Sequence, residues 1–547
     1  MPDSLRTACM AYAGKRNARM LLPFLRSGSK FQHAGLKPLG LSVLLYLLAT
    51  VGCGGGAADP KADPAPQLAT GTVAATGNPL VAQYTISPPA AATVAVQFGP
   101  DLTYALLTSP QTSAGAGEPV TVLVAGMKQN TTYHMRAIVT YSDGSQQFDS
   151  DHMFQTGTIP PQRIPSMKLT AGSAASAAPG VELMCLTIGN ANQLLALATD
   201  PAGNVIWYYD YDPSLGIPQP IKLLPNGHML TILYLQGNPG GTVQEIDLAG
   251  NVIRQFDYNA LSQKLHAAGY NIQVFSIDHD FVALPNGHLL LIVSDTRVFT
   301  DLQGYPGQTT VTGDAIVDLD ANNNPVWVWD AFDHLDVNRH PMSFPDWIHA
   351  NALVYSPDDG NLFLSSRHQS WILKIDYANG SGAGDILWKL GYQGDFQLSS
   401  DLPSDWFYAQ HDANVASSNS TGNFQMAMFD NGDDRIFDSS GTTCVGASLP
   451  YCYSTAAIFD VNETTMTASR FWSLQTPYSF WGGATRVLPN SNMFIDETAP
   501  IDLNLTGARV LEVTQSPNPA VVWQLEIDGQ NAYRTIHLPS LYPGVQW

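Results

Sequence analysis

Five polar residues that lie outside any repeated pattern carry the chemistry that this sequence can perform. They occur in "IDHDF", "DWIHAN", "SSRHQS" and "YAQHDANV", and they are His279, His349, Asn351, Arg367 and His411. A neutral imidazole can act as a nucleophile or exchange a proton near neutral pH, and a guanidinium presents a planar fork of donors to a tetrahedral oxyanion. Together these residues predict a donor-rich pocket for a group such as sulfate or phosphate.

Imidazole is also a common zinc ligand, so a metal site is an alternative for the histidines. Arg367 in the middle of the set would repel a dication, and the set of five itself includes no carboxylate. We therefore expect neither a metal nor a cofactor. A single histidine more often packs in a core or a turn. His228 and His288 fit that structural interpretation, because both repeat in "PNGH".

The elements that must position the five residues show an internal repeat. The repeat is an acidic or polar turn followed by a strand that commonly carries Trp, as in "DPAGNVIWYYD" from Asp200 and "DLDANNNPVWVWD" from Asp318, and it occurs six times. A second signature, "LPNGHMLTI" and its copies, implies four-stranded units. The sequence therefore predicts an all-β fold with a six-bladed β-propeller over residues 166–547.

Strand ends and loops at one face of a propeller converge on its central channel. Residues from different predicted blades can meet there, so separation in the sequence is no obstacle. His349 and Asn351 are two positions apart, so on a strand both side chains would point to the same side.

Residues 71–160 predict a separate small β-sandwich. Short β-rich runs such as "TVAVQFG" and "PVTVLVAG" alternate with Gly, Pro and Ser-Asp turns, and "MKQNTTYHMRAIV" resembles the tyrosine-corner segment of a fibronectin type III domain with Tyr133 at the corner. A structural role is the default for such a domain. A proline-containing linker, "TIPPQRIPS", separates it from the propeller.

The first 52 residues read as a signal peptide. A basic region precedes the apolar run "LGLSVLLYLLATVG", which is too short to span a membrane. Cys53 follows a small residue at the end of this run, which predicts lipidation of Cys53 with residues 53–70 as a flexible tether. We expect an exported periplasmic or outer-membrane lipoprotein anchored in one leaflet, with simple secretion as the alternative.

The charge and the remaining cysteines narrow the functional classes. A net charge of −21 argues against nucleic acid as a partner, because phosphate binding normally needs a basic face. In an oxidising compartment Cys444 and Cys452 in "CVGASLPYC" can close a short disulfide loop. Cys185 in "VELMCLTIG" fits a buried apolar residue better than a reactive thiol.

Three segments, "DWIHANALVYSPDDGNLFLSSRHQSWILKID", "AQHDANV" and "MFDNGDDR", resemble the bacterial arylsulfotransferase family, whose members do not use the nucleotide sulfate donor. The resemblance covers most of the chain from about residue 180 to the C-terminus. It implies a six-bladed propeller that transfers a sulfuryl group from a phenolic sulfate ester to a phenol by a ping-pong mechanism. Aryl sulfates and phenols are then the small-molecule partners, and the sequence carries no signal for an oligomeric state.

The resemblance also assigns roles by position. His411 would be the nucleophile that is transiently sulfated, and Arg367, His349 and Asn351 would hold the non-bridging oxygens. His279 would donate to the leaving phenol and later accept a proton. The family often has two adjacent histidines at that point, whereas this chain has Asp278 before His279.

For other residues of the same segments a purely structural role competes with a role in the site. His368 and Gln369 are expected to point away from the site or brace the loop, and Arg435 is expected either to support the site or to pair with a nearby Asp. The disulfide of Cys444 and Cys452 corresponds to one that some family members carry near the site. We expect an aromatic wall for the phenol ring from Trp347, Trp406, Phe407 and Tyr408, or else core packing of the same side chains.

Two other classes compete with the transferase. One is a non-catalytic, lipid-anchored propeller that binds an anionic or aromatic ligand, and covalent modification of His411 would distinguish it. The other is an aryl sulfate hydrolase, in which water accepts the sulfuryl group and the difference lies in how well the pocket excludes water.

Overall fold

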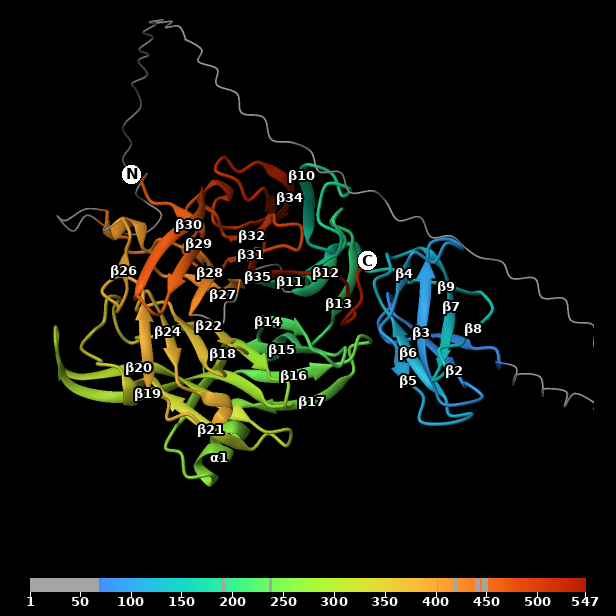
Figure 1. Ribbon diagram of the computed structural model, residues 1–547, viewed down its shortest axis with the longest axis horizontal. Coiled ribbons are helices and arrows are strands. Elements are labelled where there is room, and N and C mark those ends of the chain that lie inside the picture. The colour runs from blue at the N-terminus through green and yellow to red at the C-terminus, as the bar shows by residue number, and fades with distance from the viewer. Residues whose placement is uncertain are drawn as a thin grey trace, which may run out of the picture. The chain divides into compact units, whose positions relative to one another are not determined.

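β-Strands are the main regular secondary structure of the described residues, so the all-β fold class that the sequence predicts is confirmed. The computed structural model describes residues 68–187, 192–235, 239–400, 402–417, 422–437, 443–444 and 451–547. Within them the α-helices are α1 (Tyr258–Ala267) and α2 (Ala331–His334), and strands make up most of the rest (Figure 1). The predicted signal peptide, Cys53 and residues 53–67 of the predicted tether lie outside the described residues. No described helix is long and apolar enough to cross a membrane.

Two sheets form the region before residue 160. The alternating burial of their strands encloses a core of apolar side chains such as Val94, Val96 and Phe98. The backbone N–H of Lys128 donates to Tyr133 Oη at 3.0 Å, which is the type of hydrogen bond that a tyrosine corner makes. The strands are β1 (Thr72–Ala75), β2 (Ala82–Ile86) and β6 (Val120–Val124) in one sheet, and β3 (Ala92–Gly99), β4 (Leu106–Leu107), β5 (Gln111–Thr112), β7 (Thr132–Tyr141), β8 (Gln146–Phe148) and β9 (His152–Gln155) in the other.

Six sheets of four or five strands follow in the described part of the chain. Each is almost wholly antiparallel, and each has one edge strand with a largely buried pattern. In hydrogen-bonded order their strands are β10 (Ser166–Ala171), β34 (Val521–Asp528), β33 (Ala508–Val513), β32 (Met493–Thr498) and β31 (Ala484–Val487); β13 (Val205–Tyr209), β12 (Ala196–Thr199), β11 (Val181–Thr187) and β35 (Asn531–Leu538); β14 (Ile217–Leu223), β15 (Met229–Tyr234), β16 (Thr242–Ile246) and β17 (Val252–Asp257); β18 (Val274–Ala283), β19 (Leu289–Leu302), β20 (Tyr305–Leu319) and β21 (Pro325–Asp330); β22 (Ala350–Tyr355), β23 (Leu362–Ser366), β24 (Trp371–Ile375) and β25 (Ile386–Leu390); and β26 (Gln397–Leu398), β30 (Thr467–Thr476), β29 (Ser454–Asn462), β28 (Asn423–Asp430) and β27 (His411–Ser417).

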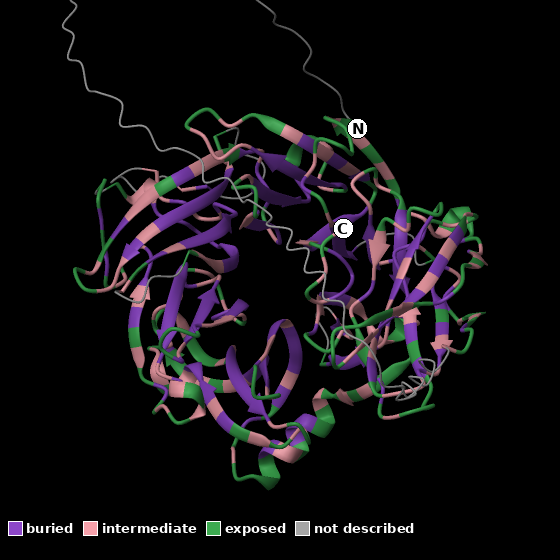
Figure 2. Cartoon of the chain, turned by 45° about the vertical axis from the view of Figure 1, so that its right-hand side comes forward, coloured by how far each residue is buried: buried purple, intermediate pink, exposed green. Residues whose placement is uncertain are grey.

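The six sheets succeed one another in a ring (Figure 2). One edge strand of each sheet, here called an inner strand, contacts the inner strand of the next sheet, and the last contact joins β35 to β14. The two ends of this region pair with sheets from the other end of the chain, because β35 pairs with β11 and β10 pairs with β34. The inner strands are β14, β18, β22, β27, β31 and β35.

The repeat in the sequence explains how neighbouring sheets are joined. The Trp of a repeat donates its indole N–H to the next sheet or to the turn that precedes that sheet's last strand; for example, Trp207 Nε1 donates to Leu248 O at 2.8 Å. In the second copy, "DLAGNVIRQFD", an arginine takes the place of Trp, and Arg254 Nη1 donates to Asn323 Oδ1. The equivalent donors in the other copies are Trp329 to Gly384 O, Trp388 to Glu463 Oε1, Trp472 to Ser516 O and Trp523 to Pro201 O.

The two repeat-linked histidines have the structural role that the sequence predicts. His228 Nδ1 lies 2.8 Å from Glu245 Oε1, and His288 Nδ1 lies 3.1 Å from Asp318 Oδ1. Both imidazoles therefore tie the "PNGH" turn to a carboxylate of the same sheet. Cys185 is buried and has no disulfide partner, and burial raises the pKa of its thiol to about 12. That environment fits an apolar core residue rather than a reactive thiol.

Candidate active site

The predicted site residues lie at irregular points of three consecutive inner strands. His279 is in β18 with φ +60°, His349 immediately precedes β22 with φ +51°, and His411 begins β27. The strand register shifts between Ile277 and Phe281, and again between His411 and Asn414. Left-handed backbone and β-bulges re-aim side chains out of the regular pleat, and non-glycine residues adopt such backbone most often at functional sites.

The structure brings the histidines together with a residue that the sequence placed elsewhere. The His279 and His349 rings lie 4.6 Å apart between centroids, and His349 stacks on His368 at the same distance. Arg367 Nη1 lies 2.5 Å from His368 Nε2. The expectation that His368 points away from the site is therefore wrong, whereas Gln369 does brace the loop by donating to Trp347 O at 2.7 Å.

His411 is held in one neutral tautomer. Its Nδ1 lies 2.7 Å from Asn431 Oδ1, and Asn431 Nδ2 donates to Ser479 O and Gly482 O at 2.8 and 3.0 Å. Since both amide hydrogens of Asn431 are used on carbonyl oxygens, Oδ1 must accept from His411 Nδ1–H. The lone pair is then on Nε2, which accepts from the Gly482 N–H at 3.3 Å.

The charge state of His411 agrees with this tautomer. The ring is buried, and burial lowers its pKa well below the usual value, with the positive charge of Arg367 acting in the same direction. The hydrogen bond to Asn431 opposes that shift without reversing it. His411 therefore offers an unprotonated Nε2 at neutral pH, which is the form that a nucleophilic imidazole requires.

Arg367 is fixed by partners on three sides. Its Nη2 lies 2.7 Å from Asp433 Oδ2 and 2.9 Å from Phe480 O, and its Nη1 contacts His368. Its Nε is buried and has no hydrogen-bond partner among the described residues. A buried donor without a partner costs free energy, so Arg367 Nε is a natural contact for an oxyanion.

Asn351 departs from the expected placement. β22 begins at Ala350, so His349 is not part of the strand and the alternation argument for a common side does not apply. Asn351 is fully buried, and its Nδ2 donates to Gln410 O at 2.7 Å, so it braces the residue before His411. Its Oδ1 has no partner among the described residues.

Two carboxylates hold the remaining histidines. His279 Nδ1 lies 2.8 Å from Asp278 Oδ1, and His349 Nδ1 lies 2.5 Å from Asp346 Oδ2. Burial lowers the pKa of His349, and Asp346 opposes that effect. Burial would raise the pKa of Asp346, but His349 and His368 outweigh it and the net pKa is lowered, so Asp346 is an anion. A carboxylate on Nδ1 fixes the ring and stabilises its protonated form.

The metal alternative can be tested on the same contacts. Asp346, His349 and His368 offer ligand atoms within 4.8 Å of one another. However, His368 Nδ1 donates to Asp346 O at 2.8 Å, and Arg367 contacts its Nε2, so both ring nitrogens are engaged. Burial and His349 lower the pKa of His368 to about 3, so the ring is neutral. These residues therefore fit a hydrogen-bonded cluster beside a guanidinium better than a dication site.

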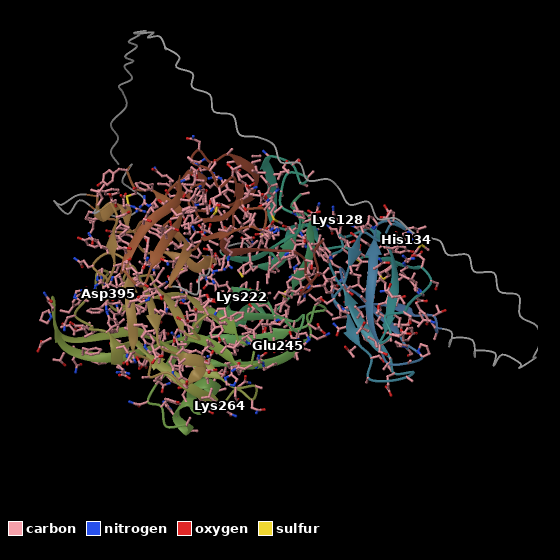
Figure 3. The ribbon with its side chains drawn as sticks, viewed as in Figure 1. Lys128, His134, Lys222, Glu245, Lys264 and Asp395 are labelled. Carbon is pink, nitrogen blue, oxygen red and sulfur yellow. A yellow bond between two sulfur atoms is a disulfide. The ribbon has the colours of Figure 1, made fainter. Side chains whose placement is uncertain are left out.

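A buried network of charges lies along the inner strands next to the site. Arg534 Nη1 and Nε lie 3.2 and 3.3 Å from the carboxylates of Asp280 and Asp412, the residues that follow His279 and His411. Arg534 Nη2 donates to Asn351 O at 2.7 Å. Lys222, labelled in Figure 3, pairs with Asp280, and Arg486 Nη2 lies 2.6 Å from Asp412 Oδ1. All six inner strands thus contribute to this network.

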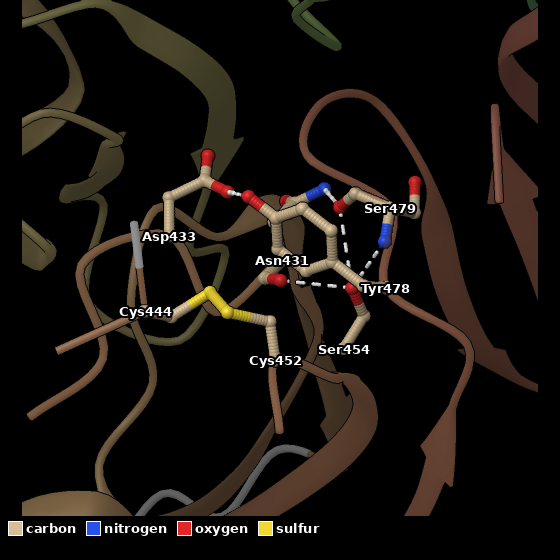
Figure 4. The surroundings of a disulfide bond; sticks show 7 residues. All are labelled: Asn431, Asp433, Cys444, Cys452, Ser454, Tyr478 and Ser479. Carbon is tan, nitrogen blue, oxygen red and sulfur yellow. Dashed lines mark hydrogen bonds between the residues drawn. A yellow bond between two sulfur atoms is a disulfide. The ribbon is translucent and has the colours of Figure 1, made fainter. Parts of the chain in front are cut away.

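The disulfide lies next to the segment that carries the carboxylate partner of Arg367. Cys444 and Cys452 are bonded to each other (Figure 4). The Asp434 N–H, one residue after Asp433, donates to Cys444 O at 3.0 Å. Asp433 accepts a hydrogen bond from Tyr478 Oη on the adjoining segment. Arg435 forms a fully buried pair with Asp430 at 2.6 Å, so of its two expected roles the salt bridge is the one observed.

The aromatic residues near the site differ from the expected wall. Trp347 stacks on Phe332 and belongs to a hydrophobic core, and a second core holds Trp406, Phe407 and Tyr408. Those side chains pack between elements, so of the two expected roles core packing is the one observed. The rings near the histidines come instead from Tyr234 and Tyr533, whose centroids lie 5.7 Å from His279 and 6.2 Å from His411. Trp481 stacks on Tyr533, and Phe480 contacts Trp481 and accepts from Arg367 through its backbone O.

Sequence reasoning missed several of these residues for an identifiable reason. His368, Asp346 and Asp433 stand in the quoted segments beside predicted residues, so their proximity in sequence was a usable signal. Tyr533 lies in the last strand and its ring is 6.2 Å from that of His411. No local pattern distinguishes it from a core tyrosine.

Comparison with known proteins places the chain in a family. The family model described as Arylsulfotransferase (ASST) matches residues 171–534. No curated protein matches the sequence significantly.

Solved structures give only distant likenesses. A Lactobacillus plantarum protein aligns at 10% identity and TM-score 0.34 over 66% of this chain and 100% of its own. A mutant apocarotenoid oxygenase of Synechocystis aligns at 12% identity and TM-score 0.25, over 86% of this chain and 96% of its own. A DUF4221-family member from Bacteroides vulgatus aligns at 9% identity and TM-score 0.27, over 69% of this chain and 100% of its own. At these TM-scores the likeness carries no argument about fold or activity.

Proposed function

The chain belongs to the arylsulfotransferase family, and from that premise we propose that it moves a sulfuryl group from a phenolic sulfate ester to a phenol through a sulfohistidine at His411. The observation that carries this proposal is the hydrogen bond from His411 Nδ1 to Asn431, because it leaves Nε2 as the nucleophilic nitrogen. The aryl sulfate and phenol substrates follow from the family. The ping-pong order and the residue roles are our inference.

In the first half-reaction, His411 Nε2 attacks the ester sulfur and the bond from sulfur to the phenolic oxygen breaks. The product ring carries a positive charge, and its Nδ1–H remains on Asn431, which supports that charge. Sulfuryl transfer, like phosphoryl transfer, is expected to pass through a loose transition state, so positioning and electrostatics dominate. Arg367 and the Gly482 N–H supply donors for the non-bridging oxygens.

The departing phenolate needs a proton. His279 can supply it from Nε2 while Asp278 holds the ring through Nδ1 at 2.8 Å. In the second half-reaction the acceptor phenol returns a proton to the same nitrogen as its oxygen attacks the sulfur. The His411–sulfur bond then breaks and the free imidazole is restored. His349 with Asp346 stands 4.6 Å away between ring centroids and holds the sulfuryl group.

Tyr234, Phe480, Trp481 and Tyr533 are proposed to receive the aromatic rings of donor and acceptor, since aromatic faces pack favourably against one another. A pocket of this kind favours phenol over water, which separates the transferase from the hydrolase alternative.

The proposal also covers the fold of the protein and its location in the cell. The six sheets with successive contacts between inner strands support a six-bladed propeller, and the Tyr133 hydrogen bond supports a fibronectin type III-like sandwich before it. Lipidation of Cys53 after export to the periplasm remains our proposal for its location. It rests on the sequence alone.

The test is intact-protein mass spectrometry after brief mixing with 4-nitrophenyl sulfate, with and without a phenol chase. We expect a mass gain of one sulfuryl group in the wild type, its loss on adding phenol, and no gain in His411→Ala. Folded wild-type protein that shows neither the mass gain nor nitrophenol release would instead support the binding scaffold. Nitrophenol release with no transfer to the phenol would support the hydrolase.

A further inference from the structure

Arg367 has a carboxylate partner inside the site that the transfer reaction itself does not require. Asp433 Oδ2 lies 2.7 Å from Arg367 Nη2, and both side chains are largely buried, at 14% and 12% exposed. Ion pairs of this kind neutralise most of a guanidinium's charge toward a distant ligand. Arg367 therefore keeps its directional donors while losing much of its attraction for a second negative charge.

The rest of the site adds no cation without a carboxylate partner, because His279 lies on Asp278 and His349 on Asp346. His411 and His368 are neutral because burial lowers their pKa values, and Asp346 is an anion beside His349. Besides Arg367, the groups around Asp433 are the Tyr478 hydroxyl, which donates to it, and the neighbouring carboxylate of Asp434. The pocket thus combines many hydrogen-bond donors with little net positive charge.

We propose that Asp433 is a specificity-determining residue that makes the site select a monoanionic sulfuryl group over a dianionic phosphoryl group of the same shape. This inference rests on the proposed function. A sulfate ester carries one negative charge and a phosphate ester carries two at alkaline pH, while both present three similar non-bridging oxygens. Hydrogen-bond geometry cannot separate them, so the separation has to come from charge.

The magnitude follows from Coulomb's law. One carboxylate several ångströms from the ligand, in a partly buried site, opposes the second charge by enough to change relative affinity about tenfold or more. Replacing Asp433 by Asn removes the charge and keeps an oxygen that can accept from Arg367 and Tyr478. Replacing Tyr478 by Phe removes the hydrogen bond to Asp433 and keeps the charge, so it serves as the matched control.

The experiment measures equilibrium binding of benzylsulfonate and benzylphosphonate by calorimetry, at an alkaline pH where the phosphonate carries two charges. Neither compound has a bridging oxygen, so neither can be turned over. We expect the wild type to prefer the sulfonate, Asp433→Asn to reduce that preference about tenfold, and Tyr478→Phe to leave it near the wild-type value. Asp433→Ser should behave like Asp433→Asn if the charge is responsible.

An unchanged preference in Asp433→Asn, or an equal change in Tyr478→Phe, would overturn the proposal. The preference is a ratio measured on one protein, so partial loss of folded material alters the stoichiometry and not the result. Binding also separates this inference from the proposed function. A wild type that discriminates by charge yet never forms sulfohistidine would retain the selectivity while refuting the transferase.

Discussion

At the scale of single residues, the site depends on which nitrogen of each imidazole carries a proton. Asn431 decides this for His411, because its own amide hydrogens are used on Ser479 O and Gly482 O. His279 and His349 place Nδ1 on a carboxylate instead, Asp278 and Asp346 respectively. An amide beside the nucleophile and carboxylates beside the other two histidines thus divide the roles between similar side chains.

Exchanging the amide for a carboxylate should move the pH dependence of the first half-reaction. In the wild type the lowered pKa keeps His411 unprotonated across the neutral range. In Asn431→Asp the new anion raises that pKa, so the ring becomes protonated on both nitrogens as the pH falls through it and cannot attack. We expect kcat/KM for 4-nitrophenyl sulfate to decline at a pH at least about one unit higher than in the wild type.

Asn431→Ala is the control for this substitution. It removes the acceptor without adding charge, so it should lower kcat/KM at every pH and move the acid limb to lower pH, the direction opposite to that of Asn431→Asp. A pH profile of Asn431→Asp that coincides in shape with that of Asn431→Ala would mean that Asn431 only packs beside the ring. Rates are to be measured by nitrophenol release under conditions where the phenol acceptor is saturating.

At the scale of elements, a buried carboxylate joins the strands that meet where the chain ends. Asp496 in β32 accepts from the Thr535 N–H of β35 at 2.7 Å and is fully buried. Burial raises its pKa to about 8, with the charges of Asp412 and Glu497 acting in the same direction. Asp496 is therefore protonated in the folded protein at neutral pH, and its Oδ1 has no partner among the described residues.

The sign of the resulting pH dependence is fixed by the direction of that shift. The folded state binds this proton more tightly than the unfolded state does, so the contribution to stability is complete below the unfolded pKa. It is lost as the pH rises from about 4 toward about 8. Asp496→Asn removes the titration and keeps an acceptor for Thr535. We expect it to raise the free energy of unfolding at alkaline pH by a few kcal/mol relative to the wild type.

Urea unfolding at acidic and alkaline pH checks this expectation. The gain in Asp496→Asn should shrink as the pH is lowered, because the wild-type carboxyl then becomes neutral in both states. Thr535→Ala provides a comparison, since it keeps the backbone N–H that contacts Asp496 and leaves the titration in place. If Asp496→Asn changed the free energy of unfolding equally at both pH values, the change would come from packing and not from the titration of Asp496.

The elements also show what sequence could and could not predict. The Trp of each repeat is a local, periodic signal, and it corresponds to a real bond from one sheet toward the next, as for Trp207 and Trp523. The pocket residues on β18, β22 and β27 were found because they break that period. The sequence could not decide whether Trp347 and Trp406 lie in a core or line the site, because a tryptophan has the same local pattern in both places.

At the scale of the whole molecule, the partners of the catalytic groups come from distant parts of the chain. Arg367 is held by Asp433 and by Phe480 O, and His411 by Asn431 and the Gly482 N–H. Each pair joins residues at least 20 positions apart in the sequence, so no short window of sequence contains them. The site is thereby coupled to closure of the fold, because β35 pairs with β11 and carries Arg534 into the centre.

Arg534 should accordingly matter to global stability far more than its neighbours in the same network. It is 1% exposed and lies between Asp280 and Asp412, and these carboxylates raise its pKa above the usual value although burial opposes them. Arg534→Met leaves both carboxylates buried without this partner, and removing one member of a buried pair costs about 3–5 kcal/mol. We expect a loss of that size in the free energy of unfolding, measured by urea denaturation.

Arg486→Met is the matched control for this last prediction. Arg486 contacts the same Asp412 but its side chain is 31% exposed, so water can replace it and the expected loss is below about 1 kcal/mol. Arg534→Lys should recover part of the stability by keeping a charge between the two carboxylates, although it cannot reproduce the planar fork that also reaches Asn351 O. Equal losses in Arg534→Met and Arg486→Met would show that the ring does not depend on this central arginine.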